Sequence, residues 1–191
     1  TATFELVDDS RRELYSGNPD EPRRLLIQVW YPAQPGEGAQ LAPWLEHVDQ
    51  LGPAIAEWIG LPSFFLDHLS LARSRAYLDA PLVPGSERFP VLLFSHGWGG
   101  FRAQNTSQVQ ELASHGYVVV GVEHTYAAVG TVFPDGTLAA HNPATLPGGT
   151  PEAEYDAAAR RLVDQWAGDL AFVTDTLTGW DESDPGGRFT G

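Results

Sequence analysis

Two short apolar runs, separated by a glycine-rich turn and a helical segment, constrain the fold of this chain more than any other feature of its sequence. Residues 91–95 (VLLFS) and 117–122 (YVVVGV) are nearly continuous apolar runs, as expected of strands covered on both faces. Between them lie the turn 96–100 (HGWGG) and the segment 104–114, whose apolar residues have helical spacing. This order predicts a βαβ unit with parallel strands and a right-handed crossover.

The segments around this unit extend the pattern to an α/β fold. Residues 3–7 and 24–31 predict an antiparallel pair of strands, and residues 131–138 predict a β-hairpin around a Pro-Asp-Gly turn. Residues 150–179 predict a long amphipathic helix with Thr150 as its N-cap. We therefore expect a mostly parallel sheet with helices on both faces.

The pattern stops before the fold is complete. The helix at 150–179 should lead to a further parallel strand, and soluble proteins avoid leaving a sheet edge open. We therefore expect residues 1–191 to be the N-terminal portion of a single domain that continues past the polar loop 181–191. Within it, residues 41–72 form a helical insert rich in large apolar side chains. The first residue is Thr1 and there is no Met, so we also expect a segment to have been removed upstream.

Composition excludes several classes of function. All 11 cationic residues are Arg, 25 residues are acidic, and the net charge of −14 argues against a nucleic-acid partner. The chain has no Cys, its six His residues lack metal-ligand spacing, and no apolar run is long enough to span a membrane. We expect no metal, no cofactor and no transmembrane segment. The compartment stays open, with a secreted or periplasmic location slightly favoured.

The glycine-rich turn is a candidate oxyanion hole. Acyl transfer develops negative charge on an oxygen, and a backbone N–H aimed at that oxygen stabilises it. In this interpretation Trp98 donates its backbone N–H, Gly97, Gly99 and Gly100 shape the turn, and His96 bonds the loop.

Two other interpretations of the turn remain open, namely tight packing alone and phosphate binding at a helix N-terminus. Arg102 occupies the third glycine position of a dinucleotide fingerprint, and a P-loop needs a Lys that the chain lacks. His124 follows the second strand, where α/β sites form, and either lines a pocket or bonds the neighbouring loop. The candidate pocket-lining residues are His96, Phe101 and His124.

Residues 89–124 resemble the plasma-type (group VII) platelet-activating-factor acetylhydrolases, which are serine esterases of the α/β-hydrolase fold. The resemblance is carried by FPVLLFSHGWGGFR and ELASHGYVVVGVEH, and by IQVWYPA at 27–33. It implies a serine carboxylester hydrolase that acts on short-acyl or lipid-like esters. It also suggests a lipid-facing or lid role for the insert, although ordinary packing over the sheet is the favoured interpretation. A polyester or cutinase-like hydrolase and a non-catalytic hydrolase-like binding domain are the alternatives.

The chain departs from that family in lacking a G-x-S-x-G nucleophile elbow. Ser95 and His96 are neighbours on a strand, where successive side chains point to opposite faces, so they form no catalytic pair. We assign no catalytic residue to this chain and expect the Ser, Asp and His downstream. The expected partners are an ester substrate and the C-terminal remainder of the same protein.

Overall fold

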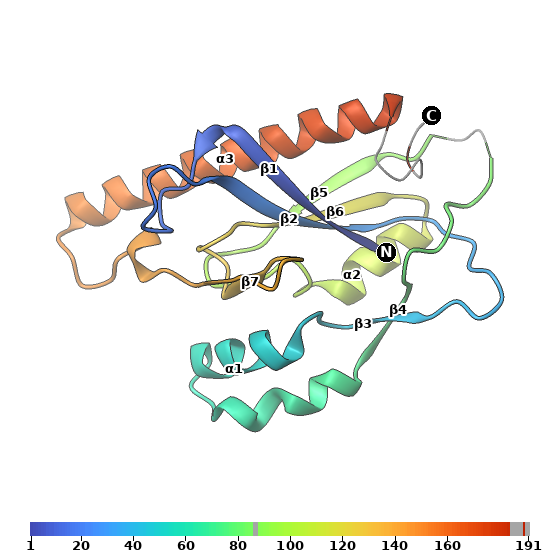
Figure 1. The fold of residues 1–191 in the computed structure, drawn as a ribbon, viewed down its shortest axis with the longest axis horizontal. Coiled ribbons are helices and arrows are strands. Elements are labelled where there is room, and N and C mark those ends of the chain that lie inside the picture. Colours follow the sequence, from blue (N-terminus) through green and yellow to red (C-terminus); the bar gives the residue numbers. More distant parts are fainter. Residues whose placement is uncertain (86–87, 184–188, 190–191) are drawn as a thin grey trace.

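The computed structural model describes residues 1–85, 88–183 and 189, and it is built around a four-stranded sheet (Figure 1). The strand order is β1-β2-β6-β5. The strands are β1 (Ala2–Arg12), β2 (Pro22–Trp30), β6 (Val118–Glu123) and β5 (Val91–Ser95). Both predicted strands of the N-terminal pair are present and pair antiparallel, as predicted.

The predicted βαβ unit is confirmed. β5 and β6 pair in parallel, with Leu93 opposite Val120, and helix α2 (Thr106–Ser114) connects them. β2 pairs antiparallel with the other edge of β6, so one of the three pairings of the described sheet is parallel. α2 ends before Gly116, which has a φ of 89° and so takes the left-handed conformation that terminates many helices.

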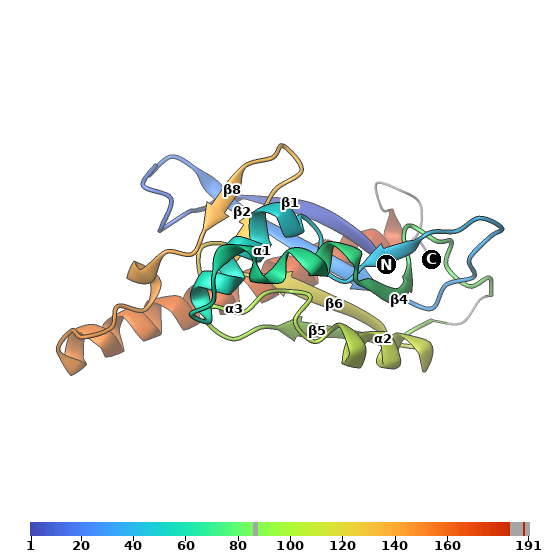
Figure 2. The ribbon, with the colours of Figure 1, turned by 90° about the horizontal axis from the view of Figure 1, so that it is seen from below.

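Helices cover the two faces of the sheet (Figure 2). Val119 of β6 packs with Val109 of α2 on one face. The next residue, Val120, points to the other face and packs in the cluster that contains Val173 of α3 (Glu152–Glu182). This alternation is the two-residue period of a strand, and it explains why the apolar run of β6 is continuous.

The prediction that residues 91–95 are covered on both faces is wrong for the described residues. β5 is the outermost strand of the described sheet, with β6 as its neighbour on one side. The side chains of Val91, Leu92 and Leu93 are consequently 51%, 38% and 36% exposed. Strand position in the sheet, rather than apolar sequence, decides this difference.

The insert and the hairpin lie together beside the sheet. The insert runs through β3 (Leu41–Pro43), α1 (Val48–Trp58), the 3₁₀ helix η1 (Ser63–Leu71) and β4 (Arg73–Tyr77), and β3 pairs with β4. The hairpin consists of β7 (Gly130–Val132) and β8 (Leu138–Ala140), as predicted, and the 3₁₀ helix η2 (Pro143–Thr145) follows it. Leu51 of α1 packs with Val132 of β7, so the insert and the hairpin share a small core.

The ends of α3 differ from the predicted ones. The Thr150 hydroxyl donates to the Pro147 carbonyl rather than capping the helix, and the N-cap position is Pro151. The helix continues to Glu182, and most of the predicted loop 181–191 lies outside the described residues. No helix in the described part of the chain is both long and apolar enough to cross a membrane.

Candidate functional site

The glycine-rich turn lies at the carboxyl end of β5 and is held by backbone hydrogen bonds on two sides. The Gly99 N–H donates to the Ala127 carbonyl at 2.8 Å, and the Val129 N–H donates to the Gly100 carbonyl at 2.9 Å. Within the turn, the Gly100 N–H donates to the Gly97 carbonyl at 2.8 Å. The segment that follows β6 thus fixes the turn that follows β5.

Trp98, the predicted oxyanion donor, has a free backbone N–H and a held side chain. Among the described residues its backbone N–H has no hydrogen-bond acceptor. Its indole Nε1 donates to the Thr145 hydroxyl at 2.8 Å. The ring meets Trp58 at 5.0 Å and His141 at 4.9 Å between centroids, and Trp98 as a whole is 37% exposed.

The three glycines of the turn differ in how much space their surroundings would leave for a Cβ atom. Gly99 has a φ of +71°, and a Cβ there would lie 2.1 Å from a ring carbon of Trp58. A Cβ on Gly100 would lie 2.9 Å from the Gly97 carbonyl oxygen. A Cβ on Gly97 would meet nothing within 4 Å, so this residue has open space above it. The tight positions are therefore Gly99 and Gly100.

His96 bonds the loop, in the way that the sequence suggests. It is 1% exposed, and its Nδ1 lies 2.8 Å from the Gly97 carbonyl oxygen. Its Nε2 lies 3.1 Å from the backbone nitrogen of His124. One imidazole thereby connects the turn after β5 to the end of β6.

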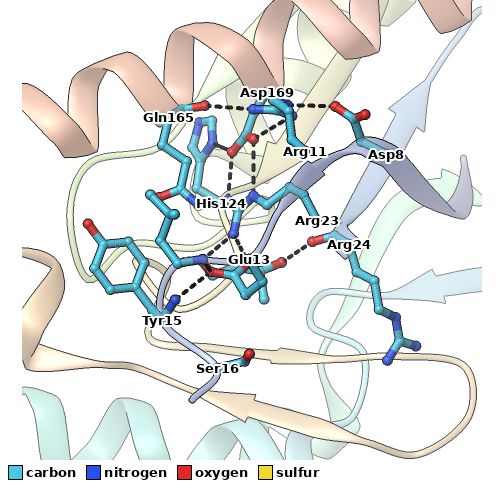
Figure 3. Close-up of polar contacts among 12 residues, drawn as sticks. Asp8, Arg11, Glu13, Tyr15, Ser16, Arg23, Arg24, His124, Gln165 and Asp169 are labelled. Carbon is cyan, nitrogen blue, oxygen red and sulfur yellow. Dashed lines mark hydrogen bonds and ion pairs between the residues drawn. The ribbon is translucent and has the colours of Figure 1, made fainter. Parts of the chain in front are cut away.

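His124 belongs to a buried ionic cluster that comes from four segments (Figure 3). Its Nδ1 lies 2.9 Å from Oδ2 of Asp169, a residue of α3. Arg23 of β2 donates to both oxygens of that carboxylate, at 3.1 and 2.7 Å, and also to Glu13. Arg11 approaches the same carboxylate at 3.0 Å. Asp169 and His124 are fully buried, and the ion pairs of Asp169 with Arg23 and Arg11 replace the hydration that its charge loses.

The electrostatics of this cluster indicate which of Asp169 and His124 carries a proton. Burial raises the pKa of Asp169, but the hydrogen bonds from His124 and Arg23 and the charge of Arg23 outweigh it and lower that pKa to about 2. Burial, together with the charges of His96 and Arg23, lowers the pKa of His124, although the hydrogen bond and charge of Asp169 act to raise it. Asp169 is therefore an anionic acceptor, and a neutral His124 carries its proton on Nδ1. Its Nε2 accepts from the Ser95 hydroxyl at 2.8 Å.

Ser95, His124 and Asp169 thus have the bonding order of a Ser-His-Asp triad, but their surroundings differ from one. Ser95 lies on a regular strand rather than on a sharp turn. The His124 ring is fully buried and stacks on Trp166 at 4.5 Å and 12°. Asp169 is shared with Arg23 and Arg11. The arrangement suits orientation of His124 better than proton transfer to a leaving group.

A second buried ion pair anchors the other end of the turn. Glu123, the last residue of β6, accepts from both the backbone N–H and the guanidinium of Arg102. Arg102 also binds Glu46 of the insert at 2.6 Å. The arginine that excluded a dinucleotide fingerprint is therefore a structural anchor of the loop.

The sequence placed Glu123 beside His124 at the end of a strand where α/β sites form, but it did not identify Asp169 or Arg23 as partners of the site. Asp169 had a usable signal, because it lies on the buried stripe of α3 between Leu162 and Val173. A charged residue on such a stripe is rarely buried unless it is paired. Its partner Arg23 comes from a strand 146 positions away, which periodicity alone does not reveal.

The candidate pocket-lining residues lie beneath or beside the loop. His96 and His124 are buried in the network just described, and Phe101 packs edge-on against Trp44 at 5.9 Å. His96, Phe101 and His124 do not line either of two open pockets, of about 780 and 650 Å³, that other described residues form. Within the same residues, no group of three or more His, Asp or Glu could hold a metal ion. The pocket-lining role stays a prediction.

A family model and the sequences of individual proteins point to the same group of relatives. The family model described as "Platelet-activating factor acetylhydrolase, isoform II" matches residues 15–149. The platelet-activating factor acetylhydrolase of Cavia porcellus is 33% identical over 102 residues, and that of Canis lupus familiaris is 29% identical over 105 residues. Each alignment covers 51% of this chain, but the chain spans 23% and 22% of the length of these relatives.

A solved structure extends the similarity to nearly the whole fold. The ferulic acid esterase from Streptomyces cinnamoneus superposes with a TM-score of 0.68 at 30% identity, covering 93% of this chain and 45% of that one. The α/β-hydrolase fold predicted from the sequence is thereby confirmed. Since the family model matches well over half of its residues, the chain belongs to the family of platelet-activating factor acetylhydrolase, isoform II.

Proposed function

We propose that the protein is a serine carboxylester hydrolase for short-acyl or lipid-like esters, and that this chain supplies one donor of its oxyanion hole. The observation that carries the proposal is the backbone N–H of Trp98, which has no acceptor among the described residues although its loop is held on both sides. A fixed donor without a partner costs no reorganisation when charge develops on a substrate oxygen. Its loss would reduce the rate by about 10²–10³.

The reaction follows the usual course of serine acyl transfer. A serine hydroxyl attacks the ester carbonyl, a histidine takes its proton and later protonates the leaving alcohol, and an aspartate orients that histidine. The carbonyl oxygen becomes negative in the tetrahedral intermediate and accepts from the Trp98 N–H and from the N–H that follows the nucleophile. We assign the nucleophile, base and acid to polypeptide downstream of Gly191, the C-terminal remainder that completes the sheet beside β5.

The relatives support this assignment because they are named as ester-cleaving enzymes. The chain belongs to an acetylhydrolase family, and a ferulic acid esterase shares its fold at 30% identity. The insert lies next to the loop, because Trp58 of α1 contacts the Trp98 ring and the face of Gly99. Side chains of the insert therefore border the space into which an acyl group would enter.

The test is covalent labelling with a fluorophosphonate, followed by mapping of the modified residue. We expect a serine outside residues 1–191 to be labelled, and p-nitrophenyl acetate to be hydrolysed. Labelling of Ser95 would instead identify the Ser95-His124-Asp169 series as catalytic. Absence of both labelling and hydrolysis in the intact, folded protein would favour the non-catalytic binding domain.

Esters of aromatic acids are a second candidate substrate class, favoured by one observation. Trp58, Trp98 and His141 form a triangle of rings with centroids 4.6 to 5.0 Å apart, beside the proposed oxyanion donor. Such rings can pack against a planar acyl group. A kcat/KM for a methyl hydroxycinnamate that exceeds the value for a short aliphatic methyl ester would select this class, and the reverse order would select short-acyl esters.

A further inference from the structure

The hydrogen bonds of the buried His96 imidazole give its two nitrogens different roles, and Oε1 of Glu123 lies 3.6 Å from Nε2. The backbone N–H of His124 points at Nε2 from 3.1 Å, and a backbone N–H can only donate, so Nε2 accepts. A neutral imidazole that accepts on Nε2 carries its proton on Nδ1. That proton is directed at the Gly97 carbonyl oxygen, 2.8 Å away.

The Gly97 carbonyl and the Trp98 N–H belong to the same peptide unit. No peptide bond between described residues is cis, so the two groups point in opposite directions. Donors from His96 and Gly100 hold the carbonyl on one side. The Trp98 N–H is therefore held toward the other side, where no described group accepts it.

Few groups act directly on this peptide group. Gly97 has no side chain, and open space surrounds the position of its missing Cβ. Glycine also has the widest choice of backbone conformations, so the peptide that follows it can rotate at low cost. The hydrogen bond from His96 is the one side-chain hydrogen bond that the described residues make to the peptide group itself, whereas the Trp98 side chain is held separately by Thr145, Trp58 and His141.

His96 is itself held by a rigid partner. The N–H that it accepts comes from His124, whose ring is fixed between Asp169 and Ser95 and stacked on Trp166. Restraint therefore passes from α3 through the end of β6 to the turn after β5.

We propose that His96 is a positioning residue for ester hydrolysis, whose Nδ1–H holds the Gly97–Trp98 peptide so that the Trp98 N–H faces the substrate oxygen. The inference rests on the proposed function. Displacement of a catalytic group by about 1 Å can cost about 10² in rate. Because Gly100 still holds the carbonyl, we expect loss of the His96 donor to lower kcat by about 10- to 100-fold, with little change in KM.

Two substitutions separate the two bonds of this imidazole. In His96→Asn the amide nitrogen can take the place of Nδ1 and donate to the Gly97 carbonyl. In His96→Gln the amide oxygen can take the place of Nε2 and accept from His124, but the donor to Gly97 is lost. We expect His96→Gln to show the fall in kcat and His96→Asn to recover it to within about threefold of wild type.

The matched control is His115→Gln. It removes another imidazole bond to a backbone carbonyl, that of Glu111, at the opposite end of α2 from the turn. We expect this variant to keep the wild-type kcat. An unchanged kcat in folded His96→Gln, or equal losses in the Asn and Gln variants, would overturn the positioning role.

A second measurement judges the inference without relying on catalysis. Nitrogen-15 NMR of the histidine rings reports which nitrogen of His96 is protonated, and we expect Nδ1. Amide hydrogen exchange at Gly100, whose N–H donates to the Gly97 carbonyl, should be faster in His96→Gln than in His96→Asn. A proton on Nε2 would overturn the proposal even in an active enzyme, whereas an inactive protein with the expected NMR result would count against the proposed function alone.

Discussion

β5 and β6 are parallel neighbours with similar apolar sequences, VLLFS and VVVGVE, but they differ in their surroundings. β6 lies between two strands and is almost wholly buried, whereas the first three residues of β5 are 36–51% exposed. The polar groups beyond their ends differ in the same way. Glu123 at the end of β6 and His124 just after it are fully buried and paired, whereas Trp98 after β5 has a backbone N–H without an acceptor among the described residues. Within the described residues, the end of β6 thus fixes the neighbouring loops, whereas the turn after β5 carries the candidate oxyanion donor.

The largest expected effect is at the buried end of β6. Asp169→Leu leaves the buried Arg23 with Glu13 as its one carboxylate partner among the described residues, so we expect a loss of about 3–5 kcal/mol in the free energy of unfolding. The control is Asp181→Asn, which breaks the exposed pair with Arg88 ahead of β5 and should cost at most about 1 kcal/mol. Urea titration measures both. Equal losses in the two variants would show that the ion pair near the end of β6 is no more important for stability than the exposed pair ahead of β5.

The strands themselves can be compared by truncation. Val120→Ala removes two methyl groups at a fully buried position of β6, and we expect a loss of about 2 kcal/mol. Leu93→Ala acts on the paired position of β5, which is 36% exposed, and should cost less than about 1 kcal/mol. If Leu93→Ala in the intact protein costs as much as Val120→Ala, further polypeptide covers β5, as the proposed C-terminal remainder would.

The charge of Asp169 predicts how stability depends on pH. Its pKa is lowered in the folded protein from 3.8 to about 2, so ionised Asp169 contributes stability above pH 4. That contribution, about 2 kcal/mol, should be lost as the pH falls from 4 to 2. Thermal unfolding across this range should show the decline in wild type and a shallower one in Asp169→Asn. Parallel pH profiles would rule out Asp169 as the source.

The smallest expected effect concerns the side chain after β5. Trp98→Leu keeps the backbone N–H, so we expect kcat for p-nitrophenyl acetate to stay within about threefold of wild type. Loss of the ring contacts with Trp58 and His141 should instead alter KM among acyl groups of different size. A fall of about 100-fold in kcat would mean that the indole itself takes part in catalysis.

The elements that depend on local pattern were predictable. The βαβ unit at 89–124, the N-terminal strand pair and the hairpin all follow from periodicity and turn residues, and the loop bond of His96 follows from its place in the turn. The exposure of β5 was not predictable, because an apolar run does not say which strands flank it. The N-cap at Thr150 was also wrong, since its hydroxyl binds Pro147 instead.

The sequence by itself determined the strand–turn–helix–strand unit, the position of the glycine-rich turn within it, and the fold class. These depend on residues within a few positions of one another, where spacing has direct geometric meaning. Only the tertiary structure decided that Asp169, His124 and Ser95 share one series of hydrogen bonds, and that His96 ties the turn to β6. Those contacts join segments up to 45 residues apart, and burial in a common interior, which no local pattern encodes, makes each partner necessary.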